Sequence, residues 1–165
     1  MTQELISSGL ASLNFSRQAL LGLLDGIPAE KLTHQLTPGG NHALWIAGHI
    51  ANADDFFLST LAGTEPKHPD KWRDLFGQGS KPINDAAAYP SLDDVKQALA
   101  NRREELLAWF QSLSSEKLAE PLPADYQQFA PNFGAFPGTL AWHEGLHAGQ
   151  LSMIRRDLGL GFVFG

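Results

Sequence analysis

Three histidine residues have the spacing and surroundings of a metal site, and two of them lie close together in the sequence. His143 and His147 are four residues apart in a segment with helical periodicity, which places both side chains on one face of a helix, one turn apart. Two imidazoles in this arrangement can bind one ion, and zinc and nickel favour such ligands. Gln150 follows on the same face, where it could orient a metal ligand.

The segment His143–His147 also matches the pattern His-Glu-x-x-His, in which zinc proteases use the glutamate as a general base. The extended protease motif places its third ligand downstream, but no His or Glu follows His147. Glu144 also points about 100° away from His143 around a helix. We therefore expect Glu144 to support the site indirectly or to form a salt bridge in the bundle. Glu144 and Gln150 are the two candidate catalytic residues.

The third ligand is expected upstream, at His49. This residue lies in an apolar helical segment, on a face shared with Trp45 and Phe56, which should point into the core. An imidazole buried there without a partner would cost about 1–3 kcal/mol, and a shared metal would supply that partner. The alternative is that each histidine only forms hydrogen bonds in or near the core. Three protein ligands with a fourth position open are typical of a catalytic metal.

The other three histidines are not expected to bind the ion. His42 lies two turns before His49 on the same face, about 10 Å away along the helix axis. We expect His42 to mark the start of that helix, or alternatively to line the mouth of a pocket. His34 and His68 lie in loop-like sequence and are expected to face solvent.

Four long segments with helical periodicity must position these residues. They are predicted at residues 2–24, 41–61, 91–113 and 139–158. Asn41 can cap the second segment. The two long connections, 64–90 and 114–138, are rich in aromatic residues that could cover the ends of the bundle or, alternatively, a ligand site. The pattern predicts an all-α fold, an up-and-down four-helix bundle with two long connecting loops, in a single domain over residues 1–165.

Composition excludes several classes of protein. The chain has no cysteine, which excludes disulfides, thiolate metal sites and a cysteine nucleophile. Twelve basic and eighteen acidic residues give a net charge of −6, so we expect no nucleic-acid partner. No apolar run reaches the ~18–20 residues that cross a membrane. Because Met1–Glu4 also lacks the basic start of a secretory signal, we expect a cytoplasmic protein.

The histidine motifs together resemble those of the DinB-like superfamily, and the resemblance extends over nearly the whole chain. The residues that carry it are Trp45-x-x-x-His49, His143-Glu144-x-x-His147-x-Gly149-Gln150 and the ending Ile154-Arg155-Arg156-x-Leu158-Gly159. The resemblance implies a four-helix bundle, frequently a homodimer, in which three histidines hold nickel or zinc. Carried over residue by residue, these ligands are His49, His143 and His147.

The resemblance implies enzyme chemistry but not one reaction. Proteins of this kind include thiol S-transferases that use bacillithiol or mycothiol, and a mycothiol-dependent maleylpyruvate isomerase. We therefore expect a metal-dependent transferase with a small-molecule substrate, in which a low-molecular-weight thiol cosubstrate supplies the sulfur. The alternatives are a metal-dependent hydrolase and a non-catalytic metal- or ligand-binding protein. Arg155 and Arg156 could bind an anionic substrate, but we expect them to be solvated in the last helical turn.

Overall fold

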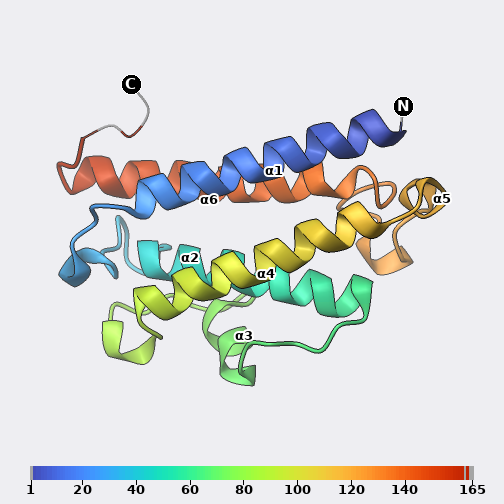
Figure 1. Ribbon diagram of the computed structural model, residues 1–165. Coiled ribbons are helices and arrows are strands. Elements are labelled where there is room, and N and C mark those ends of the chain that lie inside the picture. Colours follow the sequence, from blue (N-terminus) through green and yellow to red (C-terminus); the bar gives the residue numbers. More distant parts are fainter. Residues whose placement is uncertain (1, 162, 164–165) are drawn as a thin grey trace.

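The computed structural model of the protein describes residues 2–161 and 163 as a bundle of four long helices with shorter helices between them (Figure 1). No strand occurs within these residues. The long helices are α1 (Thr2–Leu24), α2 (Ala43–Phe57), α4 (Leu92–Ser112) and α6 (Phe136–Asp157). Among the described residues, none of the helices combines the length and the hydrophobicity that a membrane-spanning segment requires.

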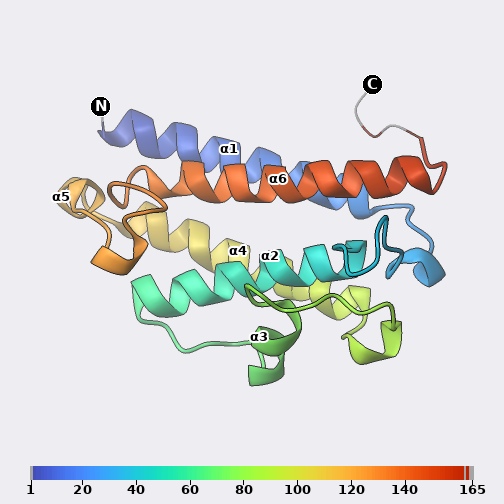
Figure 2. The ribbon, with the colours of Figure 1, turned by 180° about the vertical axis from the view of Figure 1, so that it is seen from behind.

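The bundle has two layers, because α1 packs along α6 and α2 packs along α4 (Figures 1 and 2). The predicted all-α four-helix bundle with two long connections is confirmed, but its helices do not alternate in direction as we expected. Helix α2 runs antiparallel to α1, whereas α4 runs parallel to α2 and α6 runs parallel to α1. The reason is that the connection after α2 returns along the bundle before α4 begins.

The start of α2 differs slightly from the prediction. His42, and not Asn41, is the N-cap, because its Nδ1 accepts a hydrogen bond from the backbone N–H of Trp45 at 3.1 Å. His42 is therefore a helix-start residue, as expected, and it is fully buried. At the other end, α2 continues into one π-helical turn, η2 (Leu58–Ala62), which ends at Gly63 with a φ of 70°. Glycine adopts this left-handed conformation without steric cost.

Both long connections contain short helices, as is common for connections of this length in a compact domain. The first connection contains α3 (Asp70–Phe76) and η3 (Ala86–Ala88), and the second contains α5 (Ser115–Ala119) and η4 (Ala124–Tyr126). Another short helix, η1 (Ala29–Lys31), lies between α1 and α2. In the first connection Trp72, Phe76 and Tyr89 are buried in the core against α2. These aromatic residues explain why a connection of this length is ordered against the bundle.

A layer of buried charges lies between two apolar core clusters. One cluster includes Leu20, Ile46, Leu99 and Leu151, and the other includes Leu13, Leu106, Phe110 and Phe136. The charged layer consists of one residue from each long helix: Arg17, Asp54, Arg103 and Glu144.

Both arginines of this layer contact both acids. Arg17 Nη2 and Arg103 Nε lie 3.0 and 3.1 Å from Asp54 Oδ2, respectively. Arg17 Nε lies 2.5 Å from Glu144 Oε1, and Arg103 Nη2 lies 2.9 Å from Glu144 Oε2. Burial alone would raise the pKa of Asp54, but Arg103 and Arg17 outweigh it and hold this pKa below its ordinary value. The four charges therefore satisfy one another inside the bundle.

Candidate metal centre

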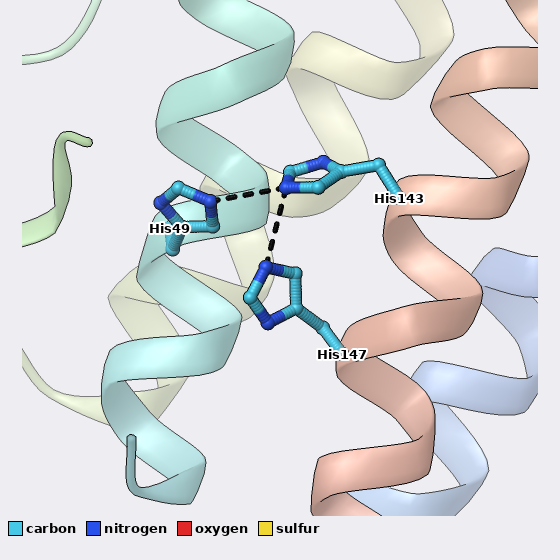
Figure 3. A group of neighbouring side chains, drawn as sticks. All are labelled: His49, His143 and His147. Atoms are coloured by element: carbon cyan, nitrogen blue, oxygen red, sulfur yellow. Dashed lines mark hydrogen bonds between the residues drawn. The ribbon is translucent and has the colours of Figure 1, made fainter. Parts of the chain in front are cut away.

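The three predicted histidines converge between the two layers of the bundle (Figure 3). His49 projects from α2, and His143 and His147 project from α6. Nε2 of His143 lies 3.2 Å from Nε2 of His49 and 3.2 Å from Nε2 of His147. Each residue offers one ring nitrogen, and the three nitrogens lie within 4.8 Å of one another. This cluster could hold a metal ion.

The geometry of the cluster fits a borderline divalent metal. Zinc binds histidine nitrogens at about 2.0–2.1 Å, so two such ligands at a tetrahedral angle lie about 3.3 Å apart. The two separations of 3.2 Å agree with that value. Three imidazoles without a thiolate or a carboxylate suit zinc or nickel better than magnesium or calcium, which prefer oxygen ligands.

Two of the histidines have their other ring nitrogen bound to an oxygen acceptor. His49 Nδ1 lies 2.6 Å from the carbonyl oxygen of Phe76, and His147 Nδ1 lies 3.0 Å from Oε1 of Gln150. Because these oxygens only accept, the proton resides on Nδ1 and the lone pair remains on Nε2. Metal-binding histidines typically have such partners, which fix the tautomer and the ring orientation.

The His49 ring is also held by aromatic packing. The Trp45 ring stacks on it, with centroids 4.7 Å apart and an interplanar angle of 9°. Trp45 is itself anchored, because its Nε1 donates a hydrogen bond to Ser80 Oγ at 3.0 Å. On the same helix, Gly48 packs so closely against the Phe76 ring that a Cβ atom there would overlap it. This close approach of α3 to α2 brings the Phe76 carbonyl to His49.

The environment of the three imidazoles favours their neutral form. Burial and, to a smaller extent, the neighbouring His49 lower the pKa of His147 to about 4, although its hydrogen bond with Gln150 acts in the opposite direction. Burial also lowers the pKa of His143 to about 4, with contributions from both other histidines. Burial lowers the pKa of His49, although its hydrogen bond to Phe76 acts in the opposite direction. Neutral imidazoles are the form that binds metals, so the site needs no deprotonation at neutral pH.

A pocket of about 510 Å³ opens beside the cluster, and His49 and His143 form part of its wall. The second long connection and the start of α6 contribute Phe129 and Phe136 to this pocket. Their position agrees with the alternative that aromatic residues of this connection cover a ligand site. Phe56 also lines the pocket, and 46% of its surface is exposed, so our expectation that it points into the core was wrong. The pocket has a size typical of small-molecule sites.

Glu144 and Gln150, the two candidate catalytic residues, have different surroundings. Glu144 is 1% exposed and forms the expected salt bridge, with both Arg17 and Arg103. This position directs its carboxylate into the charged layer. Gln150 lies next to His147 and also accepts a hydrogen bond from Asn41 Nδ2 at 3.1 Å. Gln150 thus orients a histidine of the cluster.

Two predictions about peripheral residues were wrong. The side chain of His68 is only 8% exposed and packs against Trp72, because the first connection folds onto α2. Arg155 is buried, and its Nη1 donates to the carbonyl oxygens of Leu23 and Asp25, so it joins the ends of α6 and α1. His34 was expected to face solvent, and its side chain is partly exposed. Its Nε2 lies 2.6 Å from Asp157 Oδ2.

Sequence reasoning missed the partners of the histidines. The Phe76 carbonyl has no side-chain signature, although the aromatic-rich first connection indicated that this segment packs on the bundle. Asn41 was assigned to helix capping and instead supports Gln150. The buried position of Arg17 could have been predicted, because this residue lies four positions after Leu13 and three before Leu20, on the inner face of α1.

These features define a helical-bundle protein with a three-histidine centre between its layers. The family described as the DinB superfamily matches residues 12–151, a range that contains all three histidines. The chain therefore belongs to the DinB superfamily, as its motifs predicted. A comparison with the curated proteins finds no match.

Proposed function

We propose that the protein is a metal-dependent enzyme that joins a low-molecular-weight thiol, through its sulfur atom, to a small electrophilic substrate. His49, His143 and His147 would hold the ion, with zinc or nickel as the expected metal. The observation that carries this proposal is the convergence of three Nε2 atoms beside a pocket whose wall includes two of the same histidines. When bound, a divalent ion would supply Lewis-acid chemistry and lower the pKa of a thiol or water in contact with it.

The residues around the pocket favour a thiol over water as the nucleophile. The chain has no cysteine, and no Asp or Glu is among the described residues that line the pocket. Glu144 is committed to Arg17 and Arg103. A bound ion would have to lower the pKa of water from 15.7, so a water nucleophile would benefit from a general base, which these residues do not provide. A thiol, with a pKa of about 8.5, needs less assistance, which supports the transferase over the hydrolase.

The chain's own residues would position the reactants. The Phe76 carbonyl and Gln150 hold the rings of His49 and His147 with their Nε2 atoms directed at a common point. The aromatic wall of the pocket would bind the electrophile beside these nitrogens. In the transfer, a sulfur–carbon bond forms, the leaving group departs with the bonding electron pair, and the thiol proton passes to solvent.

Cobalt substitution tests the proposal. Cobalt(II) is added to the metal-free chain, and its visible and near-ultraviolet absorption is recorded before and after a low-molecular-weight thiol is added. We expect a new sulfur-to-cobalt charge-transfer band in the wild-type protein and none in the His143→Ala variant. One cobalt per chain with a spectrum that the thiol does not change would contradict the transferase and favour a non-catalytic binding protein. A zinc-loaded sample with monobromobimane as electrophile then measures turnover.

A further inference from the structure

One positively charged side chain lies in the wall of the pocket. Arg73, in the last turn of α3, lines the pocket together with the amide side chains of Asn52 and Gln78. Its exposed guanidinium group has no hydrogen bond or ion pair within residues 2–161 and 163. No carboxylate lines this pocket within the same residues. Arg73 is therefore available to bind an anion from solution.

The remaining wall of the pocket is apolar. Most of it comes from α2, α6 and the segment before α6, through Phe56, Phe57, Phe129, Leu140 and Trp142. Three of these residues are unusually exposed for large apolar residues, with relative exposures of 46% for Phe56, 38% for Phe129 and 66% for Trp142. Exposed aromatic surface beside a concave site is typical of a surface that a ligand covers.

The combination of a single guanidinium group and an aromatic wall indicates the class of ligand. Arginine binds a carboxylate through two parallel N–H···O hydrogen bonds, which fixes its orientation as well as its charge. A single cationic side chain balances a monoanion, and the described pocket wall offers no second Lys or Arg for a phosphate dianion. Arg155, one of the two arginines that the sequence suggested for an anionic substrate, donates to backbone carbonyls and lies in the last turn of α6.

We propose that the pocket binds an aromatic carboxylate. Arg73 holds the carboxylate, and the aromatic wall of the pocket holds the ring. This assignment rests on the proposed function, because it names the substrate class of the same site. Arg73 and the histidines border one pocket, so a ligand anchored by its carboxylate places the rest of its body near His49 and His143. Arg73 thus selects anionic substrates.

Calorimetric titration of the full chain tests the inference. The probes are 1-naphthylacetate, its uncharged isostere 1-naphthylacetamide, and 1-naphthyl phosphate. The proteins are wild type, Arg73→Gln, Arg73→Lys and the control Arg156→Gln, which removes the same charge from a residue outside the pocket wall. Each protein is measured both zinc-loaded and chelator-treated, with circular dichroism to verify folding.

We expect wild type to bind the carboxylate about tenfold more tightly than the amide, as a charge-assisted hydrogen bond implies. Arg73→Gln should abolish this preference without changing the affinity for the amide. Arg73→Lys should retain part of it, and Arg156→Gln should retain all of it. The inference is overturned if carboxylate and amide bind equally, if neither binds, if Arg73→Gln keeps the preference, or if the phosphate binds most tightly.

The two metal states separate this inference from the proposed function. The preference for the carboxylate could be lost when zinc is removed and yet survive Arg73→Gln. This result would show that the carboxylate contacts the metal, which overturns the role of Arg73 and supports the metal site. A chain that binds no zinc yet keeps an Arg73-dependent preference would contradict the proposed function while the ligand class is upheld.

Discussion

His147 is held by a chain of two side chains that extends from α6 to the residues before α2. Gln150 Oε1 accepts hydrogen bonds from both His147 Nδ1 and Asn41 Nδ2, at 3.0 and 3.1 Å. Partners of this kind do not bind the metal themselves. They keep the imidazole in one tautomer and one orientation, and their loss typically lowers metal affinity about 10–100-fold.

We therefore predict that Gln150→Met lowers zinc affinity about 10–100-fold without unfolding the protein. Methionine has a similar length but lacks the oxygen that accepts the His147 proton. The measurement is competitive zinc titration against a fluorescent chelator. The matched control is Gln97→Met, because Gln97 lies on the exposed face of α4 and donates to Asn101 Oδ1. Equal zinc affinities in the two variants would show that Gln150 does not support the site.

At this scale, the sequence predicted the histidine cluster better than its surroundings. The spacing of His143 and His147 places them on one helix face in any sequence that is helical there. The roles of Arg155 and Arg73 could not be predicted from local spacing in the same way, because they depend on where the helix ends and the connections lie in the folded chain. Arg155 faces backbone carbonyls, and Arg73 faces a pocket formed partly by a connection.

The charged layer acts at the scale of whole helices. Arg17, Asp54, Arg103 and Glu144 each come from a different long helix, and all four are buried. Removing one partner of such a group leaves an uncompensated buried charge, which typically costs about 3–5 kcal/mol. Sliding any one helix along its axis would have the same effect. The layer therefore disfavours other alignments of the four helices, including alignments that would separate the histidines.

We predict that Asp54→Asn lowers the free energy of unfolding by about 3–5 kcal/mol, because Arg17 and Arg103 lose a buried counter-charge. Urea unfolding monitored by circular dichroism measures the change. The control is Asp25→Asn, which removes the solvent-exposed pair with Lys96 and should cost at most about 1 kcal/mol. Similar losses in both variants would contradict a special role for the layer.

The free energies of unfolding of wild type and Asp54→Asn should also depend differently on pH. The pKa of Asp54 is lower in the folded protein than its ordinary value of 3.8. The stability that it contributes is therefore fully present above that value and is lost as the pH falls through the folded-state pKa. The difference in the free energy of unfolding between wild type and Asp54→Asn should stay constant from neutral pH to about pH 5 and narrow in more acidic solution. A difference that widens on acidification would have the wrong sign.

The four long helices were predicted to within a few residues because each has a strong apolar periodicity and clear end signals. The short helices inside the connections were not predicted, since α3 is seven residues long and has no comparable periodicity. Its position depends on tertiary contacts, above all on the fit of Phe76 against Gly48. That fit is visible only once both segments are placed in space.

At the scale of the whole molecule, the histidine cluster joins the two layers of the bundle. His49 belongs to the α2–α4 layer, and His143 and His147 belong to the α1–α6 layer (Figure 3). The direction of the helices could not be derived from the sequence, because a long connection permits either a parallel or an antiparallel neighbour. The single domain, the homodimer, the small-molecule partner, the absence of a nucleic-acid partner and the cytoplasmic location stay predictions.

The most direct test of the account is the metal content of the tag-free protein, measured by inductively coupled plasma mass spectrometry beside His49→Ala, His143→Ala and His147→Ala. We predict about one zinc or nickel ion per chain in the wild type and loss of that ion in each variant. His34→Ala is the control, because this histidine lies outside the cluster and should leave the metal content unchanged. Wild-type protein that contains no metal and binds no added zinc or nickel tightly, with correctly folded variants, would contradict the central claim.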